Sequence, residues 1–241
     1  MSNYNIEFHK IISSALDNFN ADFFCTNNII FGGGTRIALE LNEFRESIDI
    51  DFLCPNKLSY RSVRQEIAND TLGSLVKEDF HYIREIRADR DAVRTVIKIQ
   101  DTNIKLEFVS FDNYALTFEY DPDKFPVPVL SRESCFYTKL LANSDRKLDP
   151  PYKDVFDILA MYKVWGTIPE RAIQLAESHY GVRTILPDLI KSLEDMIKYP
   201  DKYVKAASHV KMNPDWVDDI IYTQSKQLLA EVRSFLATRS K

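Results

Sequence analysis

The chain changes character near its middle, and this change limits the folds open to it. Up to Pro128, short apolar runs alternate with polar positions and turn residues, a pattern that predicts β-strands with a few helices between them. From Ser131 onward, apolar residues recur at helical spacing almost without interruption. Strands followed by helices are typical of an α+β fold, or of an α/β core with a helical C-terminal half. We therefore expect a mixed sheet flanked by helices over residues 1–128 and a helical domain over residues 129–241.

The same periodicity predicts the individual elements. Strands are expected at 29–31, 47–54, 80–87, 92–100 and 104–111, with a tight turn at 101–103. Helices are expected at about 5–20, 35–44, 60–70, 132–144, 152–164, 168–179, 184–198 and about 214–238.

Charge and cysteine content exclude several classes of protein. The formal net charge of the 241 residues is −5, so any contact with nucleic acid must use a local basic patch. The three cysteines are scattered and give neither a metal-binding spacing nor a disulfide framework. The N-terminus lacks the apolar stretch of a signal peptide, and no apolar run reaches membrane-spanning length. We expect a cytoplasmic protein without a membrane partner.

Three of the six glycines stand together, at positions 32–34, directly before the predicted helix 35–44. Glycine allows positive φ angles and close approach of a ligand to the backbone. A glycine turn that opens a helix directs free N–H groups and the positive end of the helix dipole at one point, which suits a phosphate group. Thr35 would cap the helix or bind a phosphate oxygen. The alternative is a plain tight turn between a strand and a helix.

Two aspartates lie in the strand that follows this helix. Asp49 and Asp51 are two residues apart and therefore share a face, while Ile48, Ile50 and Phe52 are expected to point into the core. Two neighbouring carboxylates repel each other unless a cation stands between them, and oxygen ligands favour Mg²⁺ or Mn²⁺. The alternative is a solvated strand face.

A third carboxylate is available on the predicted strand 104–111. Lys105, Glu107 and Val109 share one face of this strand, so Glu107 is expected to stand beside Asp49 and Asp51 in a two-metal site. The alternative is an ion pair between Lys105 and Glu107 on an edge strand.

The helical half carries a second group of charged residues. Lys139 lies among apolar residues of its helix, and a lone ammonium there suits a phosphate. Asp154 and Asp157 share a face of the next helix and would orient Lys139 or Arg146. The alternative is an ion-pair network between the two helices.

The stretch "GGGTRIALELNEFRESIDIDFL" resembles the first motif of polymerase-β-type nucleotidyltransferases. It is most similar to the branch that contains the AbiEii/AbiGii toxins of type IV toxin–antitoxin systems. The second group, in "YTKLLANSDRKLDPPYKDVFDI", is similar to a lysine, basic residue and D-x-x-D helix of that branch. The matching residues are Gly33, Gly34, Thr35, Arg45, Ser47, Asp49, Ile50, Asp51 and Phe52, then Lys139, Arg146, Asp154 and Asp157.

The resemblance implies a nucleotidyltransferase-like fold and a metal-dependent enzyme that transfers a nucleotide from an NTP to an acceptor. That acceptor would be RNA such as tRNA, and the partner would be a separately encoded antitoxin. The implied metal ligands are Asp49, Asp51 and Glu107, which with Lys139 make up the catalytic set. The implied nucleotide-binding residues are Gly33, Gly34, Thr35, Arg36, Arg45, Ser47, Lys139, Asp154 and Asp157. Two positions depart from the pattern: Glu107 stands where many relatives have aspartate, and Arg36 where they often have a small apolar residue.

Other functions remain open at this point. A D-x-D glycosyltransferase also uses a metal and a diphosphate, although it does not need the glycine turn. An inactive nucleotidyltransferase fold kept for binding is the other alternative. For an RNA acceptor, the arginines of one predicted hairpin would hold the backbone, unless they are paired with neighbouring acids: Arg84, Arg87, Arg90 and Arg94.

Overall fold

The computed structural model describes residues 4–239, which form two compact units. One unit contains residues 4–39 and 47–131, and the other contains 40–46 and 132–239. The strand-rich first part and the helical second part expected from the sequence are confirmed. The break at 131/132 lies close to the domain boundary predicted at 128/129, and the short segment 40–46 groups with the helical unit.

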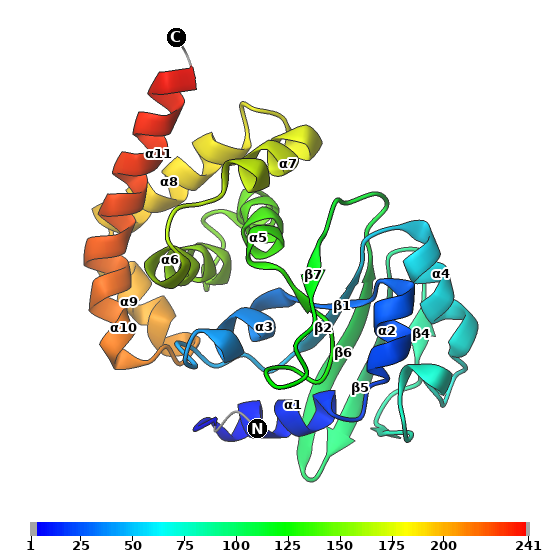
Figure 1. The fold of residues 1–241 in the computed structure, drawn as a ribbon. Helices are drawn as coiled ribbons and strands as arrows, with labels where there is room; N and C mark the ends of the chain where they lie inside the picture. Colours follow the sequence, from blue (N-terminus) through cyan, green and yellow to red (C-terminus); the bar gives the residue numbers. More distant parts are fainter. Residues whose placement is uncertain (1–3, 240–241) are drawn as a thin grey trace. The chain divides into compact units, whose positions relative to one another are not determined.

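The first unit is built on one mixed sheet (Figure 1). Its order is β3-β5-β6-β2-β1-β8-β7, and β4 pairs with β5 beside this path. β2 lies inside the sheet, parallel to β6 and antiparallel to β1. The strands are β1 (Ile30–Phe31), β2 (Ile50–Cys54), β3 (His81–Tyr82), β4 (Arg87–Ala88), β5 (Ala92–Ile99), β6 (Thr102–Ser110), β7 (Phe118–Glu119) and β8 (Val129–Leu130).

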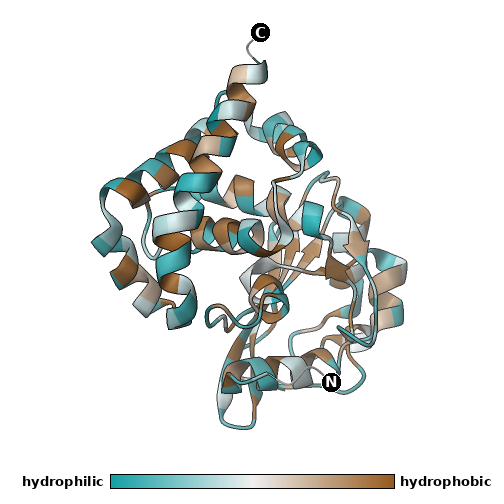
Figure 2. Ribbon diagram, turned by 60° about the vertical axis from the view of Figure 1, so that its left-hand side comes forward, coloured by the Kyte–Doolittle hydropathy of each residue, from teal (hydrophilic) through white to brown (hydrophobic). Residues whose placement is uncertain are grey.

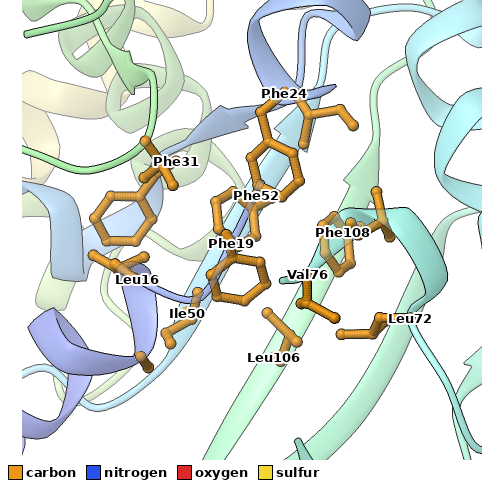
Figure 3. Packing of buried hydrophobic residues seen from close by; sticks show 14 of the residues in the cluster. Leu16, Phe19, Phe24, Phe31, Ile50, Phe52, Leu72, Val76, Leu106 and Phe108 are labelled. Carbon is orange, nitrogen blue, oxygen red and sulfur yellow. The ribbon is translucent and has the colours of Figure 1, made fainter. Parts of the chain in front are cut away.

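Helices of this unit cover the apolar face of the sheet. Phe52 of β2 and Phe108 of β6 stack with ring centroids 5.1 Å apart, and Phe19 and Phe24 pack against Phe52 edge-on (Figure 3). These rings are fully buried, so strands and helices share one core, and Asp51 and Glu107 lie on the opposite face of β2 and β6. The helices are α1 (Glu7–Leu16), α2 (Ala21–Asn27), α3 (Gly33–Glu40) and α4 (Lys57–Glu66), with a 3₁₀ turn at Gly73–Leu75.

Two strand predictions need correction. Ile48 was expected in the core, but 41% of its surface is exposed, because β2 begins only at Ile50. The predicted strand 80–87 is wrong for most of its length, because only the two-residue strands β3 and β4 form there. The pairing of 92–100 with 104–111 is confirmed by the antiparallel β5–β6 ladder, which runs from Ala92↔Val109 to Ile99↔Thr102.

The second unit is helical throughout. α5 packs against α6, α7 and α8, and α8 also packs against α9 and α11. The helices carry both apolar and polar stretches (Figure 2), as expected for elements that bury one side. The sequence prediction missed α9 and also α2, and the predicted helix 214–238 contains a π-helical stretch at Asp219–Gln224. The helices are α5 (Arg132–Arg146), α6 (Lys153–Trp165), α7 (Glu170–Tyr180), α8 (Ile185–Lys198), α9 (Pro200–His209), α10 (Pro214–Asp218) and α11 (Ser225–Arg239).

Within residues 4–239, no helix combines the length and apolar character needed to cross a membrane.

Candidate active site

The glycine turn joins β1 to α3 and lies against an aspartate of β2. Gly33 is the first residue of α3 and has a φ angle of +69°. A Cβ atom at Gly33 would collide with Oδ2 of Asp51 and would lie 3.0 Å from its Cβ and Cγ atoms. Only glycine therefore allows both the backbone conformation and the close approach of the carboxylate. The Asp51 side chain is thus held at the start of α3, where the first backbone N–H groups of a helix lack intrahelical partners.

Asp49 lies just before β2, in a loop that two side chains hold in place. The Thr35 hydroxyl donates a hydrogen bond to the carbonyl oxygen of Asp49 (2.5 Å) and lies 2.8 Å from the Ser47 hydroxyl. The backbone N–H of Ser47 donates to Nε2 of His9, which is fully buried (3.1 Å). Thr35 and Ser47 thus fix the backbone that presents Asp49, and their predicted contact with nucleotide stays a prediction.

Four charged residues form a row across the polar face of the sheet. Asp51 of β2 pairs with Glu107 of β6, Glu107 with Arg94 of β5, and Arg94 with Arg87 of β4. Residues directly opposite each other on neighbouring strands project from the same face of a sheet. Two carboxylates therefore stand next to two guanidinium groups, with Asp49 two residues before Asp51.

Both oxygens of Glu107 are engaged by cations. Oε1 accepts from Nε of Arg94 (2.8 Å) and Oε2 accepts from Nζ of Lys105 (2.7 Å). Burial of the Lys105 ammonium acts to lower its pKa. The hydrogen bond to Glu107 and the negative charges of Glu107, Asp49 and Asp51 outweigh this effect and raise the pKa of Lys105. Lys105 is therefore a charged counter-ion within electrostatic reach of all three carboxylates.

This donor set fits a hard divalent cation in its chemistry, because carboxylate oxygens are the ligands that Mg²⁺ and Mn²⁺ prefer. Over residues 4–239, however, no three Asp, Glu, His or Cys side chains are grouped closely enough to hold a metal ion. The contacts of Glu107 supply a reason, since its oxygens turn to Arg94 and Lys105. Asp49 and Asp51 would supply the primary ligands, and Glu107 would join them by exchanging a cationic partner for the metal.

Arg36 lies inside the first unit. Its guanidinium is 1% exposed, donates from Nε to the carbonyl oxygen of Leu130 (3.0 Å) and lies 5.8 Å from the ring centre of Phe125. These contacts tie α3 to β8 and to the loop that precedes it. A nucleotide contact of Arg36 stays a prediction, and the geometry supports a structural role.

The charged group of the helical unit forms a buried network. Asp157 is fully buried and accepts from Nε and Nη2 of Arg45 (2.7 and 3.0 Å), and its Oδ2 lies 2.6 Å from Nζ of Lys139. Lys139 also donates to Asp154 (3.0 Å), which accepts two bonds from Arg146. The network thus alternates Arg45, Asp157, Lys139, Asp154 and Arg146, and it matches the ion-pair alternative weighed from the sequence.

Electrostatics keep this network charged. Burial alone would raise the pKa of Asp154, but the positive charges of Lys139 and Arg146 hold it below its usual value. Burial likewise acts against the Lys139 charge, and Asp157 and Asp154 raise the pKa of Lys139 despite it. The predicted nucleotide contacts of Lys139, Asp154, Asp157 and Arg45 stay predictions.

Sequence reasoning missed two supporting residues. Nothing in the sequence marks His9, because the contact with Ser47 joins positions 38 residues apart. Arg94 becomes visible as a partner of Glu107 only when the register of β5 and β6 is known. The ion pair of Lys105 with Glu107 that was weighed from the sequence is present, although β6 lies between β5 and β2 and is not an edge strand.

The comparison with known families identifies the family of the chain. The model of the family described as "Nucleotidyl transferase AbiEii toxin, Type IV TA system" matches residues 14–226. The chain belongs to the AbiEii nucleotidyltransferase toxin family. This match confirms the family expected from the glycine turn and the D-x-D strand, and it gives no support to the glycosyltransferase alternative.

Solved structures share the fold of this chain at low sequence identity. JHP933 from Helicobacter pylori is 17% identical, with a TM-score of 0.55, and the match covers 99% of this chain and 98% of that one. A candidate nucleotidyltransferase from H. pylori is 16% identical, with a TM-score of 0.54 and coverages of 98% and 99%. No curated protein matches the chain. The nucleotidyltransferase-like fold expected from the sequence is therefore confirmed.

Proposed function

We propose that this protein transfers a nucleotide from an NTP to an acceptor hydroxyl in a metal-dependent reaction at Asp49 and Asp51. The observation that carries the proposal is the contact between Asp51 and Gly33, which joins the D-x-D strand to the start of α3. A helix start that binds phosphate and two carboxylates that bind cations are thereby brought to one point.

In this reaction the acceptor oxygen forms a bond to the α-phosphorus and loses its proton. The bond from the α-phosphorus to the oxygen of the β-phosphate breaks, and pyrophosphate leaves. The backbone N–H groups of Gly33, Gly34 and Thr35 would hold the β- and γ-phosphates, and Thr35 would keep Asp49 in place through its backbone.

Mg²⁺ or Mn²⁺, held by Asp49, Asp51 and Glu107, would neutralise the charge on the triphosphate and on the leaving pyrophosphate. Lys105 supplies a positive charge to the same carboxylates when they are without metal. A positive charge at this position reduces the repulsion between the neighbouring carboxylates.

RNA is the acceptor class that we propose, and the cytoplasm is the compartment that we propose. A hollow of about 880 Å³ lies on the polar face of the sheet, lined by Arg84, Arg87 and Arg94 together with Lys105. Arg94 is paired with Glu107 and Asp89, whereas no carboxylate among the described residues contacts Arg84 or Arg87. Because the row Arg87–Arg94–Glu107–Asp51 crosses the sheet, this hollow borders the carboxylates, and Arg84 and Arg87 would hold a backbone whose end reaches them.

The family belongs to type IV toxin–antitoxin systems, so we also propose a separately encoded antitoxin as partner.

The first test uses labelled NTPs with total RNA. Asp49→Asn and Asp51→Asn should each abolish transfer while the protein stays folded, because each removes a ligand charge and keeps side-chain size. Asp70→Asn is the matched control, since Asp70 is exposed and distant in sequence from the site. Unchanged transfer in either site variant would reject the proposal, and absence of transfer by the wild type with any NTP would favour the inactive-fold alternative.

The acceptor class has its own test. Each phosphate contact with a single strand contributes about −0.7 to the slope of log affinity against log salt. The double variant Arg84→Gln/Arg87→Gln should therefore flatten the slope for RNA by about 1.4. NTP affinity should not change. A salt-independent RNA affinity would reject the RNA acceptor and leave nucleotide transfer standing.

A further inference from the structure

A second basic hollow lies beside α4, in the first unit. It has a volume of about 650 Å³ and is formed by α4, the turn between β4 and β5, and the end of β6. Four basic and two acidic side chains line it, so its net charge is +2 in a chain whose total is −5. The charged residues are Lys57, Arg61, Arg64, Arg90, Asp91 and Asp112.

The acids of the hollow are already engaged. Lys57 pairs with Asp112 (3.0 Å) and Arg90 with Asp91 (3.5 Å), and all four side chains are largely exposed. Arg61 and Arg64 are also exposed, and no carboxylate within residues 4–239 contacts either of them.

Arg61 and Arg64 are three residues apart on α4 and therefore lie on one side of the helix. A guanidinium group presents several N–H donors in a plane and matches the oxygens of a phosphate. Two such groups, neither of them paired with a carboxylate of the described residues, form a surface suited to phosphate oxygens.

The wall of this hollow is fixed to the hairpin. Tyr60, on the same helix, is buried and donates from its hydroxyl to the carbonyl oxygen of Asp89 (2.7 Å). Burial first, and then the charge of Asp89, raise the pKa of Tyr60 to about 12, so the hydroxyl keeps its proton near neutral pH. The helix that carries Arg61 and Arg64 is thereby tied to the β4–β5 turn.

The β4–β5 turn separates the two basic hollows. Arg87 and Asp89 line the hollow on the sheet face, whereas Arg90 and Asp91 line the hollow beside α4. Arg90, which the sequence grouped with Arg84, Arg87 and Arg94, therefore belongs to the second hollow. Neighbouring residues of this one turn therefore line both hollows.

We infer that the hollow beside α4 binds phosphodiester groups of the acceptor RNA, as a second site beyond the carboxylates; this inference rests on the proposed function. A strand of RNA carries a phosphate on every nucleotide, so it can occupy both hollows as it passes over the β4–β5 turn. A free NTP or pyrophosphate offers the same phosphate chemistry, and the test below separates the two sources.

The test measures binding of a labelled single-stranded oligoribonucleotide to the full chain at several salt concentrations. Arg61→Gln/Arg64→Gln should flatten the log–log slope by about 1.4 and weaken binding at 0.1 M salt by roughly 25-fold. NTP affinity and transfer to a very short acceptor should stay at wild-type values. The matched control is Arg183→Gln/Lys226→Gln, which removes two exposed charges from the helical unit and should leave the slope unchanged.

Each other outcome overturns the inference in a distinguishable way. If the α4 variant binds RNA like the wild type while the wild type transfers nucleotide to RNA, the second site is wrong and the proposed function stands. If the variant loses affinity for NTP or pyrophosphate instead, the hollow binds free phosphates. If the wild type transfers nucleotide but does not bind RNA, both the RNA acceptor and this site are wrong. Equal melting temperatures of variant and wild type would show that the fold is retained.

Discussion

Replacing Gly33 by alanine tests the local geometry of the proposed site. Gly33 has a φ angle of +69°, and an alanine in this conformation costs about 1–2 kcal/mol. The added Cβ would also collide with the Asp51 carboxylate, which must then move away from the start of α3. A displacement of about 1 Å in a catalytic group lowers rates by about 10²-fold. Gly33→Ala should therefore be less stable than wild type and at least 100-fold slower in nucleotide transfer.

Gly181→Ala is the matched control for this experiment. Gly181 has a φ angle of +87°, and no heavy atom lies within 4 Å of its would-be Cβ, so it carries the backbone strain without the collision. Gly181 has a ψ angle of 150°, a backbone region that is essentially restricted to glycine, so urea unfolding of Gly181→Ala should give a loss of about 1–3 kcal/mol with wild-type transfer rates. The reasoning is refuted if Gly33→Ala transfers nucleotide at the wild-type rate, or if Gly181→Ala slows transfer as much as Gly33→Ala does.

Three further predictions concern the charged residues. Asp157→Asn should destabilise the protein by about 3–5 kcal/mol in urea unfolding, because two buried cations lose a shared carboxylate. The exposed control Asp149→Asn should change the free energy of unfolding by about 0.5 kcal/mol or less, and equal effects of the two variants would contradict the buried network. The pKa of Asp154 is depressed in the folded state, so its stabilising effect is present above the unfolded pKa of about 3.9 and is lost as the pH falls. The difference in unfolding free energy between wild type and Asp154→Asn should therefore hold from pH 5 to 8 and shrink below about pH 4, and a difference that does not change with pH would refute this. Lys105→Met removes the ammonium that competes for Glu107, so half-maximal transfer should need several-fold less Mg²⁺; an unchanged or higher requirement would show that Lys105 does not oppose metal binding.

The local pattern was sufficient to predict the strands that carry the site. The alternation of residues 104–108 correctly placed Glu107 on the polar face, because Ile104, Leu106 and Phe108 are all buried on the other. The same reasoning failed for Ile48, because alternation gives no sign of where a strand begins, and pairing with β6 starts only at Ile50. It also failed for residues 83–86, where apolar and charged residues alternate but only short pairs with β5 form.

The local partners, Lys105 with Glu107 and Lys139 with Asp154 and Asp157, were among the alternatives weighed from the sequence. The long-range partners could not be predicted, because they depend on register and on contacts far apart in the chain. Lys139 and Asp157 were identified as a group, yet the buried contact of Asp157 with Arg45 joins positions 112 residues apart. The sequence did not indicate a binding role for Arg61 and Arg64, since basic residues on one side of a helix are common. Only the position of the β4–β5 turn beside α4 makes them part of a hollow.

The most direct test of the central claim compares NTPs labelled at the α-phosphate with NTPs labelled at the γ-phosphate, incubated with wild-type protein, Mg²⁺ and RNA. Attack on the α-phosphorus predicts that α-label appears on the acceptor, that γ-label is released as pyrophosphate, and that Asp51→Asn abolishes both. Transfer of γ-label to the acceptor, or label transfer that persists in Asp51→Asn, would contradict nucleotide transfer at the D-x-D strand.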